Sequence, residues 1–421
     1  MEIFITLTFI IGYIAIASEG FIKIDKAASA LVTGVLCWTI YIVSQQDKHA
    51  VTHQLMEQMG DISGILFFLL GAMTIVELID AHDGFQLITE RIKTKNIRKL
   101  LWIISITTFF LSAILDNLTT TIVIISMLRK IINDREQRLL FAGVTIIAAN
   151  AGGAWSPLGD VTTTMLWIGG QITPLNIITR LFLPSLMCLL VPVTIISFRL
   201  KGDVEAPQYF SKNLTTTPFK RNFIFFLGIS IFLFIPVFKT LTHLPPFMAM
   251  LLGLGVMWII TELIHKKDTT EKEVLSVVSA LQKIDTPSIL FFLGILISIS
   301  ALQSVGLLTQ AAQWLTASIG NQSVIVIIIG LLSAVVDNVP LVAATQGMYS
   351  LTDYPPDHFL WEFLAYATGT GGSCLIIGSA AGVAAMGLEK MDFFWYVKRI
   401  SWLALLGYFA GALVYILQNN L

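Results

Sequence analysis

Long apolar runs separated by short polar stretches fill the chain. Most of these runs approach or exceed the ~20 residues that carry an α-helix across the hydrocarbon of a bilayer. The apolar segments are 3–18, 27–44, 61–79, 99–115, 118–132, 139–170, 176–199, 222–238, 246–264, 286–304, 321–336, 338–350, 359–388 and 393–418. Since only helices and closed barrels satisfy their backbone polar groups in lipid, the pattern predicts an all-α polytopic membrane protein.

Two of the polar stretches between these segments carry specific predictions. Residues 83–96 (GFQLITERIKTKNI) are too polar to span and predict an amphipathic helix at the membrane interface. Residues 200–221 form a long polar linker, which we expect in the cytoplasm. Near the start, Ala15-Ile16-Ala17 resembles a signal-peptide cleavage site, but no lysine or arginine precedes the apolar run. We therefore expect a retained helix there.

The two halves of the chain match in order. ILFFL occurs in both halves, Trp38 has a counterpart in Trp258, and SAILDN in the first half corresponds to SAVVDN in the second. These matches predict an internal repeat, with residues 1–199 as the first copy and 222–421 as the second.

The distribution of lysine and arginine predicts a topology for each half. Basic residues flank segment 99–132 at both ends, so it should enter from the cytoplasm and return as a re-entrant hairpin. No lysine or arginine flanks its counterpart, 321–350, which should dip in from outside. With broken helices at 139–170 and 359–388, each half has five crossings and one hairpin. An odd number of crossings makes the repeats inverted, with both termini outside.

Composition excludes several classes of protein. The chain is 55% hydrophobic and 13% charged, well below the ~25% charged residues of soluble domains. Its net charge is −1, and no basic cluster with interleaved aromatics indicates a nucleic-acid partner. The three cysteines lie in apolar segments without metal spacing, and no pattern of nucleophile and base is evident. We expect packing cysteines, no cofactor and no enzyme activity.

Three carboxylates lie inside apolar segments. Asp116 and Asp337 each precede an asparagine at the turn of a predicted hairpin, and Asp160 follows the break in 139–170. A carboxylate at mid-bilayer costs about 2.5–3.5 kcal/mol on insertion scales, so its presence is by default a functional hypothesis. Burial disfavours the charged form and a bound cation favours it. A proton and a small cation can therefore compete for one group.

The two long segments carry helix breakers next to these acids. Asn150-Ala151-Gly152-Gly153 precedes Pro157 and Gly159, and Gly369-Thr370-Gly371-Gly372 lies in the matching segment. Interrupted helices leave free carbonyls, which together with carboxylate, amide and hydroxyl oxygens suit a hard cation. No lysine or arginine lies in either hairpin turn or break, as an anion site would require. The predicted main site consists of Asp116, Asn117, Asn150, Asp160, Thr162 and Thr163, the first five of which would hold sodium.

Each choice has a simpler alternative. Aspartates in turns commonly cap helices, the glycine pairs could serve close helix packing, and the threonines could bond back to their own helix. Asp61 and Asp285 begin predicted segments and are more typical of caps than of ligands. Glu77 lies near the interface, where snorkelling would explain it.

At these residues the sequence resembles the NhaD family of sodium/proton antiporters, within the wider ion-transporter superfamily of inverted-repeat carriers. The resemblance covers nearly the whole chain and includes IDKAASALVTGVLCW, AMTIVELIDAHDGF, SAILDNLTTT, NAGGAWSPLGDVTT and SAVVDNVPL. It implies exchange of sodium or lithium for protons across a bacterial inner membrane, with a chloroplast envelope less favoured. The polar positions of the family fall on the six residues above and on a second-repeat set of Ser333, Asp337 and Asn338, to which Thr370 and, as a looser match, Ser373 are added.

We therefore expect a secondary antiporter that exchanges sodium or lithium for protons by alternating access. Its partners would be small cations, protons and the lipid bilayer, with a homodimer left open. A sodium- or proton-coupled anion permease of the same fold, for arsenite or a dicarboxylate, is the alternative. Relatives that carry dicarboxylates have Ser-Asn-Thr at the hairpin turns, where this chain has Asp-Asn-Leu and Asp-Asn-Val. A passive channel is disfavoured because two inverted halves suit alternating access.

Overall fold

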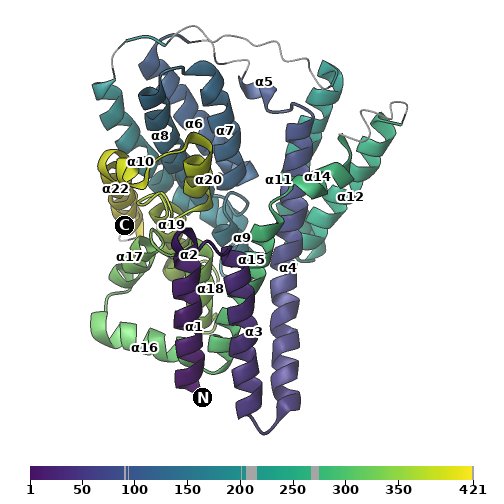
Figure 1. Ribbon diagram of the computed structural model, residues 1–421, viewed down its shortest axis with the longest axis vertical. Helices are drawn as coiled ribbons and strands as arrows, with labels where there is room; N and C mark the ends of the chain where they lie inside the picture. The colour runs from purple at the N-terminus through teal and green to yellow at the C-terminus, as the bar shows by residue number, and fades with distance from the viewer. Residues whose placement is uncertain (90–91, 93, 201, 205–215, 267–274, 420–421) are drawn as a thin grey trace.

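The computed structural model describes residues 1–421 except 90–91, 93, 201, 205–215, 267–274 and 420–421 (Figure 1). The described residues form helices and, within those ranges, no strand beyond an isolated bridge between Asn96 and Asp203. The helices are α1 Glu2–Ala17, α2 Glu19–Ile22, α3 Lys26–Ser44, α4 Lys48–Ala81, α5 Gln86–Thr89, α6 Ile97–Leu115, α7 Asn117–Ile131, α8 Arg135–Ala154, α9 Val161–Ile168, α10 Pro174–Arg199, α11 Pro218–Thr242, α12 Pro246–Ile264, α14 Val277–Lys283, α15 Thr286–Ser304, α16 Leu307–Ile319, α17 Gln322–Leu332, α18 Asn338–Met348, α19 Phe359–Gly371, α20 Ala380–Glu389, α21 Phe393–Tyr396, the π-helical turn Val397–Ser401 and α22 Trp402–Asn419.

The protein is an integral membrane protein. Eight helices of the described part are long and apolar enough to cross a membrane. Large hydrophobic side chains such as Phe198, Phe219 and Leu241 point outward and are largely exposed, as expected for contact with lipid. α4 has 34 residues, or about 51 Å at 1.5 Å per residue. It therefore extends beyond a hydrocarbon core of about 30 Å, as its polar first turns allow (Figure 1).

Helices α8 and α19 form the centre of the protein. Every residue from Phe141 to Ala154 in α8 and from Leu360 to Gly371 in α19 is buried. A helix that is enclosed on all sides needs apolar residues all round, and both helices have them apart from a few hydroxyl and amide side chains and the carboxylate of Glu362 in α19, which accepts from the Tyr415 hydroxyl at 2.7 Å. Polar groups on these two helices are thus shielded from lipid and bulk water.

Glycine allows the central helices to be enclosed. A Cβ atom on Gly152 of α8 would collide with the Phe109 carbonyl oxygen of α6, and one on Gly371 of α19 would collide with the Gly330 carbonyl oxygen of α17. The glycine pairs therefore serve close helix packing. α8 continues through Gly152 and Gly153 to Ala154, whereas α19 ends at Gly371, so the breaks in the two long segments begin at residues 155 and 372.

The two halves of the chain make corresponding contacts. α3 packs along α15, and their sequence counterparts α12 and α4 also pack together. α6 packs on α8 as α17 packs on α19, and α10 lies against its counterpart α22. The Trp38 indole in α3 donates to the Ile297 carbonyl (3.0 Å) and the Ser300 hydroxyl (3.2 Å) of α15, which joins the halves through a buried side chain.

Some predicted elements differ from the structure. The predicted interface helix 83–96 is a single turn, α5, in the described residues; residues 90, 91 and 93 lie outside them, as does most of the linker 200–221. The helix α16, which lies at the lower left of the molecule in Figure 1, was not predicted because its apolar positions are interleaved with glutamine and threonine. The prediction that Asp61 caps a helix is wrong, since α4 already begins at Lys48. Asp285 does cap α15, accepting from the Ser288 amide at 3.2 Å.

Candidate ion-binding site

Asp160 and Ser379 occupy equivalent positions after the two helix breaks. Asp160 precedes α9 with φ −147° and ψ 149°, and Ser379 precedes α20 with φ −148° and ψ 154°. Each side chain caps its helix: Asp160 accepts from the Thr162 amide at 3.0 Å and Ser379 from the Gly382 amide at 3.2 Å. The same backbone geometry thus presents a carboxylate in the first half and a neutral hydroxyl in the second.

Asparagines from both halves of the chain donate hydrogen bonds to the Asp160 carboxylate. Asn117, at the start of α7, donates to its Oδ2 at 2.8 Å. Asn338, at the start of α18, donates at 3.3 Å to each oxygen. The Thr162 hydroxyl donates to Oδ1 at 3.0 Å. Asp160 is only 2% exposed, and in the described part of the chain no lysine or arginine pairs with it. A buried carboxylate with neutral donors alone needs a proton or a cation to balance its charge.

Asn150 of α8 connects this carboxylate to the second half. Its side-chain oxygen accepts from Asn117 at 3.0 Å, and its amide nitrogen donates at 2.9 Å to the hydroxyls of Ser373 and Ser379. Asn150 is completely buried. The network therefore joins the start of α7, both central segments and the cap of α20, and Ser379 belongs to it although it was not among the predicted site residues.

Asp116 joins α6 to α7 in a strained backbone conformation. Its φ of 86° and ψ of 160° lie in a region that is essentially restricted to glycine, at a cost on the order of 1–3 kcal/mol. Its carboxylate accepts from the Thr119 amide (2.8 Å) and hydroxyl (3.0 Å), so it caps α7 as the simpler alternative supposed. It also lies close enough to Asp160 for the two charges to repel. Capping and a role in the site are therefore compatible.

Asp337, the counterpart of Asp116, has a different partner. It precedes α18 without a capping hydrogen bond from its side chain. Instead, the Lys26 ammonium at the start of α3 lies 3.8 Å from its Oδ2 and 4.6 Å from the centre of the Phe291 ring. Both charged groups are partly exposed, and Asp337 lies within electrostatic reach of Asp160. The three carboxylates thus form a series with Asp160 in the middle.

Sequence analysis missed Lys26 because it searched only the hairpin turns and the breaks for basic residues. The available signal was a lysine at the very start of an apolar segment, in the stretch IDKAAS. The argument that no positive charge lies near the carboxylates therefore holds only for the turns and breaks themselves. Lys26, which belongs to another helix, brings a positive charge to Asp337.

The other predicted site residues bond to the backbone. Thr163 donates to the Asp160 carbonyl at 2.9 Å, and Thr370 donates to the Tyr366 carbonyl at 2.6 Å. Ser333 donates to the carbonyls of Gly330 and Thr368. These hydroxyls shape the helices around the site. In the described residues, no group of three or more His, Cys, Asp or Glu side chains is arranged to hold a metal ion, so a cation here would rely on amide, hydroxyl and carbonyl oxygens around Asp160.

Discontinuous helices that bring a buried carboxylate together with asparagines from both halves of the chain, inside a lipid-facing helical shell, define a membrane transporter. The chain belongs to the CitMHS family, described as citrate transporter, whose family model matches residues 13–369.

Two kinds of named relative extend this assignment. The chain is 47% identical over 422 residues to "Sodium/proton antiporter 1" of Arabidopsis thaliana, covering 100% of this chain and 73% of that protein. It is 28% identical over 445 residues to "Na(+)/H(+) antiporter NhaD" of Alkalimonas amylolytica, covering 98% and 89%. The resemblance to NhaD-type antiporters that the sequence motifs indicated is therefore confirmed over the full length of the chain.

A solved structure shares the fold. The Alcanivorax borkumensis YdaH transporter, described as having an unusual topology, matches with a TM-score of 0.51 at 13% sequence identity, covering 89% of each chain. At this level of identity the likeness concerns the helical architecture alone.

Proposed function

We propose that this protein exchanges sodium or lithium for protons across a membrane by alternating access. The observation that carries the proposal is Asp160, a buried carboxylate held by Asn117 and Asn338 from two different hairpins and paired with no lysine or arginine of the described chain. The names of the Arabidopsis and NhaD relatives support it. Transported ions are substrates here, and no cofactor or enzymatic step is part of the proposal.

The chemistry follows from the surroundings of Asp160. Burial and the repulsion from Asp116 and Asp337 disfavour an unneutralised carboxylate, so either a proton or a small cation must be present. Because the amide donors come from both hairpins, a movement of either hairpin changes how well the carboxylate is held. Occupancy by a cation and occupancy by a proton would then favour different arrangements of the hairpins, which is the requirement for coupled exchange.

Cation-dependent proton flux in proteoliposomes tests the proposal. With an imposed proton gradient and a pH-sensitive dye, addition of sodium or lithium should dissipate the gradient, and addition of choline should not. Flux that is independent of the cation, or a requirement for a transported anion, would contradict antiport. The comparison of sodium, lithium and potassium also gives the selectivity.

An anion permease is the second candidate, and two observations favour it. The matching family is described as citrate transporter, and Lys26 places a positive charge beside Asp337. This candidate predicts uptake of a labelled di- or tricarboxylate driven by a sodium or proton gradient. The surroundings of Asp160 favour the antiporter. Its donors are neutral and leave its negative charge uncompensated, and a carboxylate repels an anionic substrate.

We further propose that residues 1–199 and 222–421 are inverted repeats and that both termini lie outside a bacterial inner membrane. Corresponding contacts such as α3 with α15 and α12 with α4 support the repeat, and the distribution of lysine and arginine supports the orientation. Reporter fusions at the two termini test the orientation: a periplasm-active reporter should be active at both. Crosslinking in the native membrane tests the homodimer.

A further inference from the structure

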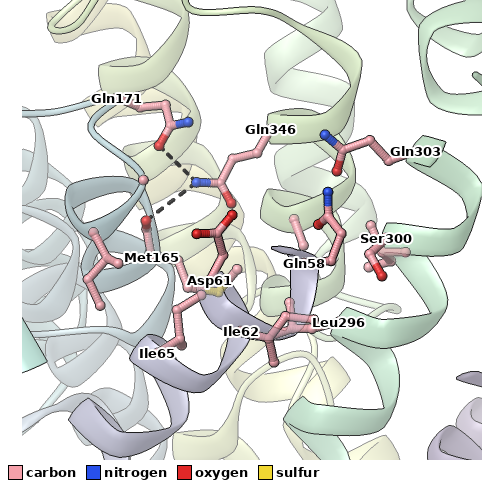
Figure 2. A pocket seen from close by; sticks show the side chains of 14 residues that line it. Gln58, Asp61, Ile62, Ile65, Met165, Gln171, Leu296, Ser300, Gln303 and Gln346 are labelled. Atoms are coloured by element: carbon pink, nitrogen blue, oxygen red, sulfur yellow. Dashed lines mark hydrogen bonds between the residues drawn. The ribbon is translucent and has the colours of Figure 1, made fainter. Parts of the chain in front are cut away.

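A polar pocket of about 360 Å³ lies between α4 and α15 on one side and α9 and α18 on the other. Its volume has room for roughly ten water molecules at about 30 Å³ each. Figure 2 shows the side chains that line it. The polar ones are Gln58, Asp61, Gln171, Ser300, Gln303 and Gln346. Four amides, a hydroxyl and a carboxylate thus line one space that opens to the surface, since Asp61 and Gln303 are exposed whereas Gln171 and Ser300 are buried.

Asp61 is the single charged group in this lining. It lies inside the long helix α4, where it serves neither as a cap nor, within the described residues, as a member of an ion pair or hydrogen bond. Neighbouring amides are partly engaged: those of Gln171 and Gln346 are hydrogen-bonded to each other at 2.9 Å (Figure 2). A carboxylate retained in an apolar helix costs free energy unless it faces water.

The pocket ends close to the ion-binding site. Met165 of α9 and Ala343 of α18 belong to its lining. Met165 is five residues beyond Asp160, and Ala343 is five beyond Asn338, or about 7–8 Å along each helix at 1.5 Å per residue. Met165 and Val339, the latter between Asn338 and Ala343 in the sequence, are almost completely buried. Apolar side chains, among them a flexible methionine, therefore lie along the short helical stretches from the pocket lining to the ion-binding site.

We infer that this pocket is an aqueous vestibule for hydrated sodium or lithium ions, and that Asp61 attracts them to it. The inference rests on the proposed function, because it takes Asp160 as the end of the ion pathway. Amide, hydroxyl and carboxylate oxygens suit a hydrated monovalent cation. A single negative charge in a narrow, low-dielectric space raises the local cation concentration without binding the ion tightly. The N-terminal half of α4 places the vestibule toward the end of the molecule that carries the N-terminus (Figure 1).

Cysteine labelling tests the vestibule without any transport. The three native cysteines are free and buried, so a charged methanethiosulfonate reagent should report on an introduced one. Gln303→Cys and Ala343→Cys should both react, and Gln303→Cys should react severalfold faster with a cationic than with an anionic reagent. Adding Asp61→Asn should remove that preference. Leu413→Cys, exposed on the apolar surface of α22, is the control and should stay unreactive.

Transport measurements test the role of Asp61. Asp61→Asn should raise the half-saturating sodium concentration severalfold, and more than it lowers the maximal rate, whereas the exposed helix cap variant Asp285→Asn should do neither. Absence of labelling at both cysteines, or a charge preference that survives Asp61→Asn, would overturn the vestibule. An unchanged half-saturating concentration in Asp61→Asn would overturn the recruiting role. If the wild type shows no sodium-dependent proton flux, the proposed function fails, and the labelling still decides whether the pocket is aqueous and cation-attracting.

Discussion

Asn338 of the second half donates a hydrogen bond to Asp160 of the first half, at 3.3 Å from each carboxylate oxygen. Asn117, its counterpart in the first half, donates to the same carboxylate at 2.8 Å. Two residues at matching sequence positions in the two halves thus converge on one acid, and the neutral Ser379 caps α20 as Asp160 caps α9. The site is therefore a single asymmetric centre built by both halves.

Asp160→Asn should abolish cation-dependent proton flux, with a loss of at least about a hundredfold, or about 2.7 kcal/mol. Asparagine is also a good helix cap, so α9 should still form and the purified protein should keep its melting temperature. Asp285→Asn makes the same change at the cap of α15, away from the site, and should retain exchange. Flux in Asp160→Asn comparable with that of wild type would remove this residue from the mechanism.

Asp116→Asn should strongly reduce exchange, by tenfold or more (about 1.4 kcal/mol), because it removes the charge that neighbours Asp160. The capping bonds from Thr119 can be kept by the asparagine oxygen, so stability should change little. Thr119→Val separates the two roles, since it removes the hydroxyl donor to Asp116 and leaves the charge. Exchange should survive Thr119→Val. Should Asp116→Asn prove fully active in the dye assay, Asp116 is a cap and no more.

Lys26→Gln should lower the half-saturating sodium concentration severalfold, because the ammonium that balances Asp337 would no longer compete with a cation. In an Asp337→Asn background the same change should have no effect, which makes the pair a double-mutant cycle. Lys283→Gln is the matched control: it breaks the ion pair with Glu77, 3.7 Å long and partly exposed, at another place in the fold. Equal effects of Lys26→Gln in both backgrounds would show that the two charges are not coupled.

Gly152→Ala should lower the thermal stability of the purified protein by about 1–3 kcal/mol, because the new methyl group meets the Phe109 carbonyl of the backbone. Gly371→Ala should behave alike against Gly330. Gly60→Ala in α4 meets no atom within 4 Å and should be neutral, or stabilising by up to about 1 kcal/mol from helix propensity. Thermal unfolding in detergent measures all three. A neutral Gly152→Ala would mean that α6 and α8 are less closely packed than described.

Local pattern in the sequence was enough to predict most of the fold. Apolar runs predicted the spanning helices, and Asp-Asn pairs such as Asp116-Asn117 predicted junctions between helices. The role of these acids in transport stays a prediction, based on the cost of a carboxylate in lipid, which is a property of that residue in any fold. The break at 155–160 follows from the glycines and the proline of the first long segment, and the break at 372–379 from the glycines of the second. Each of these inferences concerns residues close together in the chain.

Contacts between distant residues were decided by the tertiary structure alone. Lys26 reaches Asp337, Asn338 reaches Asp160, and Asp61 faces a polar pocket only because helices from opposite halves pack against each other. A helical pattern specifies which face of a helix is polar. It does not specify which other helix lies against that face, because this depends on side-chain packing over the whole core.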